Sequence, residues 1–177
     1  MTALFSFCPA CASPKIAFEN SRMFTCPDCD FVYYHNTAAA AACIIESDAG
    51  LVFLVRNNDP GKGKLDLPGG FIDPGEGVFE GLYRELREEL GWMPPLRPTL
   101  VASFPNVYPY KNIPYNTCDL IFAVRAPGLR AQDLRLERGE IAAVRCIKPH
   151  EIDYDEIAFD SIRRAVQAYV LPAAKKL

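Results

Sequence analysis

The sequence of 177 residues lacks several features that define large classes of protein. No apolar run approaches the roughly 20 residues that a helix needs to cross a bilayer. The N-terminus lacks a basic start followed by an apolar stretch of signal-peptide length, so we expect a cytoplasmic protein with no membrane partner. The net charge of -3 lacks the strong positive excess that drives nonspecific binding to nucleic acid, and it argues against a nucleic-acid partner.

The composition provides enough material for one hydrophobic core. Half of the residues are hydrophobic, and 177 residues suffice for one domain of ordinary size and a small additional unit. There is no internal repeat and no low-complexity segment. In a reducing compartment, the seven cysteines are expected to be metal ligands or buried thiols rather than disulfides.

Two C-x-x-C pairs lie near the N-terminus and are separated by the fourteen residues 12–25. This spacing lets both thiolates of a pair reach one ion from a tight turn, and two such turns complete a closed tetrahedral zinc site. A thioredoxin-like redox pair is the weaker alternative, because it would lie beside a strand–helix unit and a second pair would be redundant. The pattern resembles a zinc ribbon, and we predict one over residues 1–36 with a structural Zn²⁺. The predicted ligands are Cys8, Cys11, Cys26 and Cys29.

From Thr37 onward the hydrophobic pattern is typical of strands alternating with helices. Apolar stripes predict helices over residues 78–90 and 158–169. The stretch 105–115 is rich in proline and tyrosine, and it is predicted to be a stiff loop. Strands are predicted over residues 38–45, 51–56, 98–104, 117–125 and 141–147, and within the ribbon over residues 16–18, 23–25 and 31–34.

The first predicted helix carries three carboxylates on one ridge. Residues three and four apart share a helix face, so Glu85, Glu88 and Glu89 lie together. Like charges at this spacing repel each other, which is unfavourable unless a cation is bound. Because Mg²⁺ and Mn²⁺ prefer carboxylate oxygens, the ridge predicts a divalent-cation site. A solvated acidic face is the alternative, but it explains neither the preceding glycines nor the spacing.

The segment 70–92 resembles the signature of the Nudix hydrolases, in which a glycine, a glutamate, an Arg-Glu pair, a Glu-Glu pair and a final glycine recur at fixed spacing. The resemblance implies that residues 37–177 form a Nudix α/β/α sandwich with a mixed sheet. It also implies an enzyme that cleaves phosphoanhydrides with Mg²⁺ or Mn²⁺. The matching positions are Gly70, Glu76, Arg84, Glu85, Leu86, Glu88, Glu89, Gly91 and Trp92.

The same resemblance implies roles for individual residues. The three helix glutamates would bind the catalytic cation together with the carbonyl oxygen of Gly70. Arg84, on a neighbouring face, would pair with Glu76 and brace the preceding loop against the helix. One helix glutamate or a loop glutamate would take a proton from the attacking water. By analogy of position, Glu137 or Glu140 would bring a further carboxylate to the metals, with ordinary surface glutamates as the alternative.

The family resemblance further implies that the substrate is a nucleoside diphosphate linked to another group. A zinc ribbon before a Nudix domain resembles the NADH pyrophosphatases, but residues 103–109 lack the glutamine and tryptophan of their S-Q-P-W-P-F-P-x-S motif. We expect ADP-ribose, NADH or a similar molecule to be cleaved to a nucleoside monophosphate. Tyrosine rings of the 105–115 stretch could stack on a base or simply cover the core. The candidates are Tyr108, Tyr110 and Tyr115.

Two other functions remain open. The first is a catalytically silent Nudix-fold nucleotide sensor, although a sensor would not need the complete carboxylate set. The second is a hydrolase of nucleotide-capped RNA 5′ ends that binds RNA through the ribbon, although Lys15 and Arg22 are too few for a basic patch. A homodimer formed through the ribbon is a further alternative.

Overall fold

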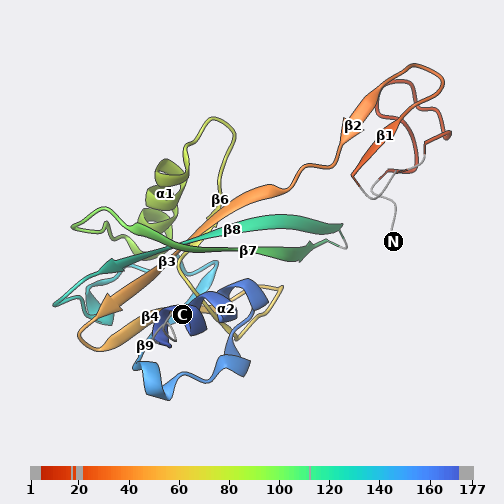
Figure 1. Ribbon diagram of the computed structural model, residues 1–177. Helices are drawn as coiled ribbons and strands as arrows, with labels where there is room; N and C mark the ends of the chain where they lie inside the picture. Colours follow the sequence, from red (N-terminus) through yellow and green to blue (C-terminus); the bar gives the residue numbers. More distant parts are fainter. Residues whose placement is uncertain (1–4, 17, 19–21, 112, 172–177) are drawn as a thin grey trace, which may run out of the picture.

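The computed structural model describes residues 5–16, 18, 22–111 and 113–171. Within these residues the chain forms a two-stranded sheet near the N-terminus and a seven-stranded sheet in a larger body. Figure 1 shows the small sheet set apart and joined to the larger body by the segment that leads into β3 (Ala38–Ser47). No helix in the described part of the chain is long and apolar enough to span a membrane.

The small sheet pairs β1 (Met23–Thr25) with β2 (Val32–Tyr34) in antiparallel register. The predicted strand over residues 16–18 is wrong at Ile16 and Phe18, which lie in no strand, and residue 17 is outside the described residues. Just before it, the backbone N–H of Lys15 donates to the Ser13 hydroxyl at 3.1 Å, which is a local turn bond rather than a sheet bond.

The larger body is built on one mixed sheet with the strand order β5-β4-β3-β8-β7. β6 lies beside β3, and β9 lies beside β4. The β3–β8 pair is parallel and the other pairs are antiparallel, as the mixed-sheet prediction requires. After β3 the strands and α-helices are β4 (Gly50–Arg56), β5 (Leu65–Asp66), β6 (Gly69–Phe71), α1 (Val78–Leu90), β7 (Thr99–Tyr110), β8 (Ile113–Arg125), β9 (Ile141–Ile147) and α2 (Asp160–Val170). Three short 3-10 helices lie between β8 and α2 in the described residues, at Ala131–Asp133, Pro149–Glu151 and Tyr154–Glu156.

The helices α1 and α2 cover opposite faces of this sheet. Successive strand residues point to opposite sides, so each strand contributes side chains to both faces. In β3, Cys43 and Ile45 belong to the hydrophobic layer of α1, whereas Ala42 and Ile44 belong to that of α2. The residues of β4 alternate in the same way. This arrangement of two layers confirms the predicted sandwich. The buried helix residues are Leu82, Leu86 and Leu90 in α1, and Ile162, Ala165 and Val166 in α2.

α1 occupies the predicted residues 78–90, with defined contacts at both ends. Gly91 adopts the left-handed conformation at φ 58°, and its N–H donates to the carbonyl of Arg87 at 2.9 Å. This closes the C-terminus of the helix in the way that glycine favours. At the other end, the carboxylate of Glu80 accepts the N–H of Gly77 at 2.6 Å. The helix is therefore fixed at both ends, which sets the direction of its acidic ridge.

The prediction of a loop over residues 105–115 is wrong. β7 continues to Tyr110 and β8 begins at Ile113, and the two strands stay paired up to that last pair. Prolines suggested a loop because they cannot donate a ladder hydrogen bond. Pro105 and Pro109 are tolerated because β7 is the edge strand of the sheet. The tyrosines of this stretch are therefore held on a β-hairpin, which orders them more strongly than a loop would.

We expect Leu86→Ala to lower the free energy of unfolding by about 2–5 kcal/mol, because it removes a fully buried side chain that anchors α1. Leu100→Ala on the edge strand is the control, since Leu100 is 52% exposed and its loss should cost roughly 0.5 kcal/mol or less. Urea unfolding followed by the fluorescence of Trp92 measures both. Equal losses in the two variants would contradict this assignment of the core.

Candidate functional site

A cavity of about 830 Å³ opens beside α1 and is lined from β3, β5, β6, the β7–β8 hairpin and the start of α2. This volume lies in the range of small-molecule sites. The cavity collects the predicted site residues from segments that are far apart in the sequence. Those in its lining are Gly70, Arg84, Glu85, Glu88, Glu89, Tyr108, Tyr110, Tyr115, Glu137 and Glu140. Glu76 is not in the lining and reaches the site through Arg84.

The three helix glutamates differ in how they are held. Glu89 is only 8% exposed, and one of its oxygens accepts the backbone N–H of Gly69 at 2.8 Å. Glu85 is also largely covered and lies against Gly70, where an added Cβ would come within 2.6 Å of the Glu85 carboxyl carbon. The Glu88 side chain is 57% exposed. A side chain at position 70 would therefore displace the Glu85 carboxylate from its present position.

Burial and neighbouring charge raise the pKa of two of these carboxyls. Burial raises the pKa of Glu89 well above its usual value, and the nearby carboxylates of Asp66, Glu85 and Glu140 add to this effect. Burial also raises the pKa of Glu85, although Arg84 opposes the shift. The site thus concentrates negative charge without enough positive charge to balance it. Such a set of oxygen donors fits a hard divalent cation, which would favour the ionised forms.

Arg84 is the main cation of the ridge and contacts both the helix and the preceding loop. Its Nε donates to Glu76 at 2.8 Å, and its Nη1 donates to Glu85 at 2.7 Å and to Glu88 at 3.1 Å. Its Nη2 donates to the carbonyl of Phe71 at 2.9 Å. The guanidinium therefore ties the end of β6 to α1, in the geometry expected for the predicted Arg84–Glu76 brace.

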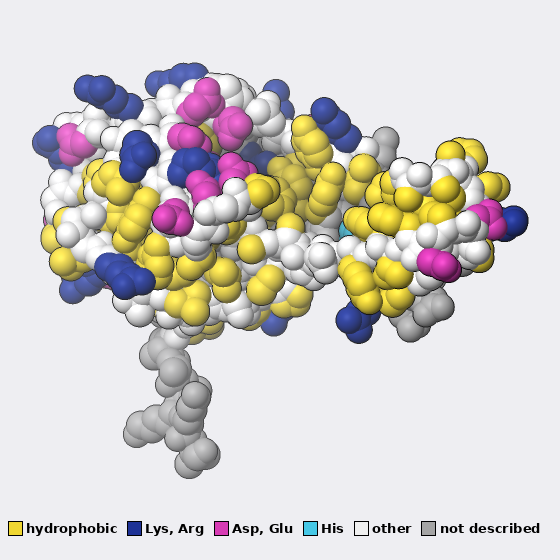
Figure 2. Space-filling model, turned by 90° about the horizontal axis from the view of Figure 1, so that it is seen from above, with side chains coloured by type: hydrophobic (Ala, Val, Ile, Leu, Met, Phe, Trp, Pro, Cys, Tyr) yellow, Lys and Arg dark blue, Asp and Glu magenta, His cyan; other side chains and the backbone are white. Residues whose placement is uncertain are grey.

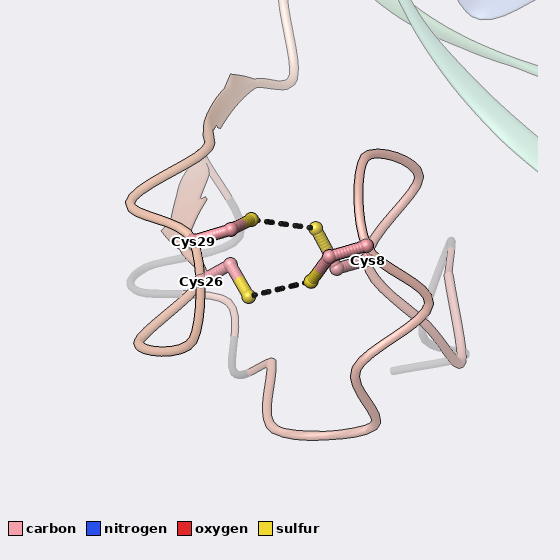
Figure 3. Close-up of side chains that lie close together, drawn as sticks. Cys8, Cys26 and Cys29 are labelled. Carbon is pink, nitrogen blue, oxygen red and sulfur yellow. Dashed lines mark hydrogen bonds between the residues drawn. The ribbon is translucent and has the colours of Figure 1, made fainter.

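The four ribbon cysteines form a second cluster. Their sulfur atoms all lie within 4.8 Å of one another, with 3.7 Å between Cys8 and Cys29 and 3.6 Å between Cys11 and Cys26. In Figure 3, the sulfurs of Cys26 and Cys29 face those of the opposite loop across a small gap. Zinc–sulfur bonds of about 2.3 Å in a tetrahedron imply sulfur separations of about 3.8 Å, so the donor set fits Zn²⁺.

The cavity lining also contains residues that the sequence did not single out. Arg56 donates to Asp66 at 2.7 Å and to the hydroxyl of Tyr108 at 3.3 Å, and its guanidinium lies 5.0 Å from the ring centre of Phe159. Burial raises the pKa of Asp66 to about 6, although Arg56 opposes the shift. Asp119 also lines this cavity. The sequence feature that could have identified Asp66 and Asp119 is a carboxylate among hydrophobic strand residues.

The chain matches a known protein family over most of its length. Residues 35–168 match the NUDIX domain family. The chain belongs to the Nudix family. Its segment 70–92, with the acidic ridge of α1, is therefore the Nudix signature helix and the glycine-containing turn before it.

Several curated relatives share part of this Nudix chain. The ADP-ribose pyrophosphatase of Methanocaldococcus jannaschii is 42% identical over 67 residues, covering 38% of this chain and 40% of that protein. The NAD-capped RNA hydrolase NudC of Stutzerimonas stutzeri is 31% identical over 85 residues, covering 48% and 30%. The human mitochondrial NAD(P)H pyrophosphatase NUDT13 is 28% identical over 140 residues, covering 77% and 37%. The chain thus spans less than half the length of these relatives.

Solved structures of Nudix proteins have the same fold. The crystal structure of a NUDIX hydrolase from Nitrosomonas europaea matches with a TM-score of 0.66 and 24% identity, covering 94% of this chain and 90% of that chain. A MutT NUDIX hydrolase from Burkholderia pseudomallei matches with a TM-score of 0.64 and 20% identity, covering 75% and 98%. At these identities the likeness concerns the fold alone.

We expect the purified chain to hold one zinc ion, and a strong chelator to unfold the ribbon while the Nudix body stays folded. The reason is that so small a core depends on its metal for stability. Metal analysis and NMR of the ribbon aromatic side chains measure the two effects. Cys11→Ser should lower the zinc content, whereas Cys118→Ser, which changes an exposed cysteine outside the cluster, should not. Ribbon signals unchanged in zinc-free protein would contradict the assignment.

Proposed function

We propose that the chain is a Nudix pyrophosphohydrolase that depends on Mg²⁺ or Mn²⁺ and cleaves a nucleoside diphosphate linked to another group. The observation that carries the proposal is the acidic ridge of α1. It holds three carboxylates, two of them largely buried, at the wall of a cavity of about 830 Å³. Charge of this density beside a cavity of that size suits a cation that bridges protein and a diphosphate.

The residues of the acidic ridge and of the β6 turn have different roles in the proposed reaction. Glu85, Glu88 and Glu89 would hold the cation with the carbonyl oxygen of Gly70. When bound, the cation supplies charge neutralisation at the phosphoryl oxygens and lowers the pKa of water. Arg84 keeps the ridge and the β6 turn in register.

The general base would come from the loop before β9. The carboxylates of Glu137 and Glu140 both line the cavity, and neither makes an ion pair among the described residues. One oxygen of Glu137 is already used, because it accepts the N–H of Glu140 at 2.6 Å. The Glu140 carboxylate is therefore the better candidate to take a proton from the attacking water.

ADP-ribose and NADH are the proposed substrates. Support comes from relatives named ADP-ribose pyrophosphatase and NAD(P)H pyrophosphatase, although each matches over only part of its length. The cavity volume also suits a dinucleotide better than a single base. Residues 1–36 would be a separate zinc ribbon and residues 37–177 the hydrolase domain.

Hydrolysis of nucleotide-capped RNA is a second candidate. Curated relatives from three bacteria carry the name NAD-capped RNA hydrolase. The ribbon also exposes apolar and aromatic side chains, with Phe7 at 58% and Tyr34 at 56%. Hydrophobic side chains cover much of the ribbon in Figure 2, whereas acidic and basic side chains lie together on the larger body. Exposed rings can stack on RNA bases, which is the physical basis for this candidate.

A hydrolysis screen with Mg²⁺ or Mn²⁺ tests the proposal. We expect ADP-ribose or NADH to yield a nucleoside monophosphate, detected by chromatography, and we expect chelation to abolish the reaction. FAD, coenzyme A, nucleotide sugars and an NAD-capped RNA complete the panel. Turnover of the RNA alone would favour the second candidate, and inactivity on the whole panel would favour a nucleotide sensor.

We expect Glu88→Gln to reduce kcat by at least about a hundredfold with little loss of stability, because an exposed charge is removed while the shape is kept. Glu89→Gln should behave similarly, since a glutamine can still accept the N–H of Gly69. Glu80→Gln, in the first turn of the same helix, is the matched control and should keep its activity. Wild-type turnover in both active-site variants would disprove the metal assignment.

A further inference from the structure

The carboxyl group of Asp119 is a buried acidic group that the proposed chemistry does not use. Asp119 is 7% exposed, lies in the middle of the hydrophobic strand β8, and lines the cavity. Among the described residues it makes no ion pair. A buried carboxylate without a cation is costly, so an apolar residue would serve the sheet better.

Two buried hydroxyls hold this carboxylate in one orientation. The Thr117 hydroxyl donates to Oδ1 at 2.7 Å, and the Ser161 hydroxyl donates to Oδ2 at 2.5 Å. Thr117 lies on the same strand, whereas Ser161 is fully buried in the first turn of α2. These bonds fix the position of both oxygens but leave each with a further lone pair. Asp119 is thus a rigid hydrogen-bond acceptor at the cavity wall.

Aromatic rings surround this part of the cavity. Tyr108 lies 5.4 Å from Phe71 and 5.5 Å from Phe159, measured between ring centres, and all three residues line the cavity. Phe159 immediately precedes α2, two residues before the Ser161 hydroxyl that holds Asp119. Phe71 is 37% exposed, so part of its surface is available to a ligand. The combination of ring surfaces with a fixed acceptor suits a flat heterocycle that carries an N–H donor.

We propose that Asp119 determines base specificity by accepting a hydrogen bond from the exocyclic amino group of adenine, with the base packed against the Phe71, Tyr108 and Phe159 rings. This inference rests on the proposed function, because it names the part of the cavity that takes the adenosine half of the substrate. The diphosphate then extends toward the acidic ridge of α1. An ionised carboxylate accepts but cannot donate, so a base that presents a carbonyl or a bare C–H at this position would be disfavoured.

Binding of nucleosides without metal tests the proposal independently of hydrolysis. Adenosine and purine riboside differ only in the 6-amino group, and neither carries a phosphate that the acidic ridge would repel. We expect adenosine to bind the full-length protein at least about tenfold more tightly, as measured by titration with NMR detection. In Asp119→Asn, adenosine should lose at least about tenfold in affinity while purine riboside changes little. The asparagine can still bond to both the Thr117 and Ser161 hydroxyls, which favours folding.

Two further variants separate specificity from general damage. Phe71→Leu should weaken both nucleosides to a similar extent and leave their ratio unchanged, because it removes ring surface but no acceptor. Asp133→Asn changes a carboxylate paired with Arg130 outside the cavity, and it should alter neither affinity. Equal binding of the two nucleosides by the unaltered protein, or an unchanged ratio in folded Asp119→Asn, would overturn the proposal. A retained, Asp119-dependent ratio in a chain that hydrolyses nothing would support it while refuting the proposed activity.

Discussion

Mutual repulsion among the α1 carboxylates is the constraint on which the rest of the site depends. Arg84 contacts Glu85 and Glu88, but the buried Glu89 has only a backbone N–H as its hydrogen-bond donor among the described residues. The ridge is therefore under-compensated, and the surrounding chain must tolerate it. The close approach of Gly70, the fixed ends of α1 and the leucines beneath it all serve to hold charged oxygens in place. A protein without a cation to bind would gain stability by losing this arrangement.

The two candidate metal sites of the chain differ in donor chemistry and in access. Four thiolates in the ribbon can enclose a soft, tetrahedral ion completely and leave no open position. The carboxylates of α1 are harder donors on one wall of an open cavity, so a cation held there keeps sites for water and phosphate oxygens. The first arrangement suits folding of a small unit, and the second suits chemistry. The mixed sheet explains how the second is rigid, because its two faces are packed separately by α1 and α2.

The parts of the structure that could be predicted from the sequence are those determined by residues close together in the chain. The extent of α1, its cap at Gly91 and the paired cysteines each follow from residues within a few turns of chain. The hairpin at 105–115 was missed because the edge position of β7, which tolerates its prolines, is a property of the whole sheet. Phe159 could not be placed for the same reason. It reaches the cavity only because α2 packs under β7 and β8, far away in sequence.

Asp66 and Asp119 could be recognised only in part from the sequence. A carboxylate inside a hydrophobic strand is visible in the sequence, and its desolvation cost indicates that something must compensate it. The structure distinguishes the two residues, since Asp66 pairs with Arg56 whereas Asp119 accepts hydrogen bonds from the Thr117 and Ser161 hydroxyls. The fold therefore accounts for Asp66. The oxygens of Asp119 keep lone pairs that can accept further hydrogen bonds, and Asp119 lines the cavity. In the proposed function, the signature helix carries the residues for the reaction, whereas base recognition depends on a strand residue that the signature does not include.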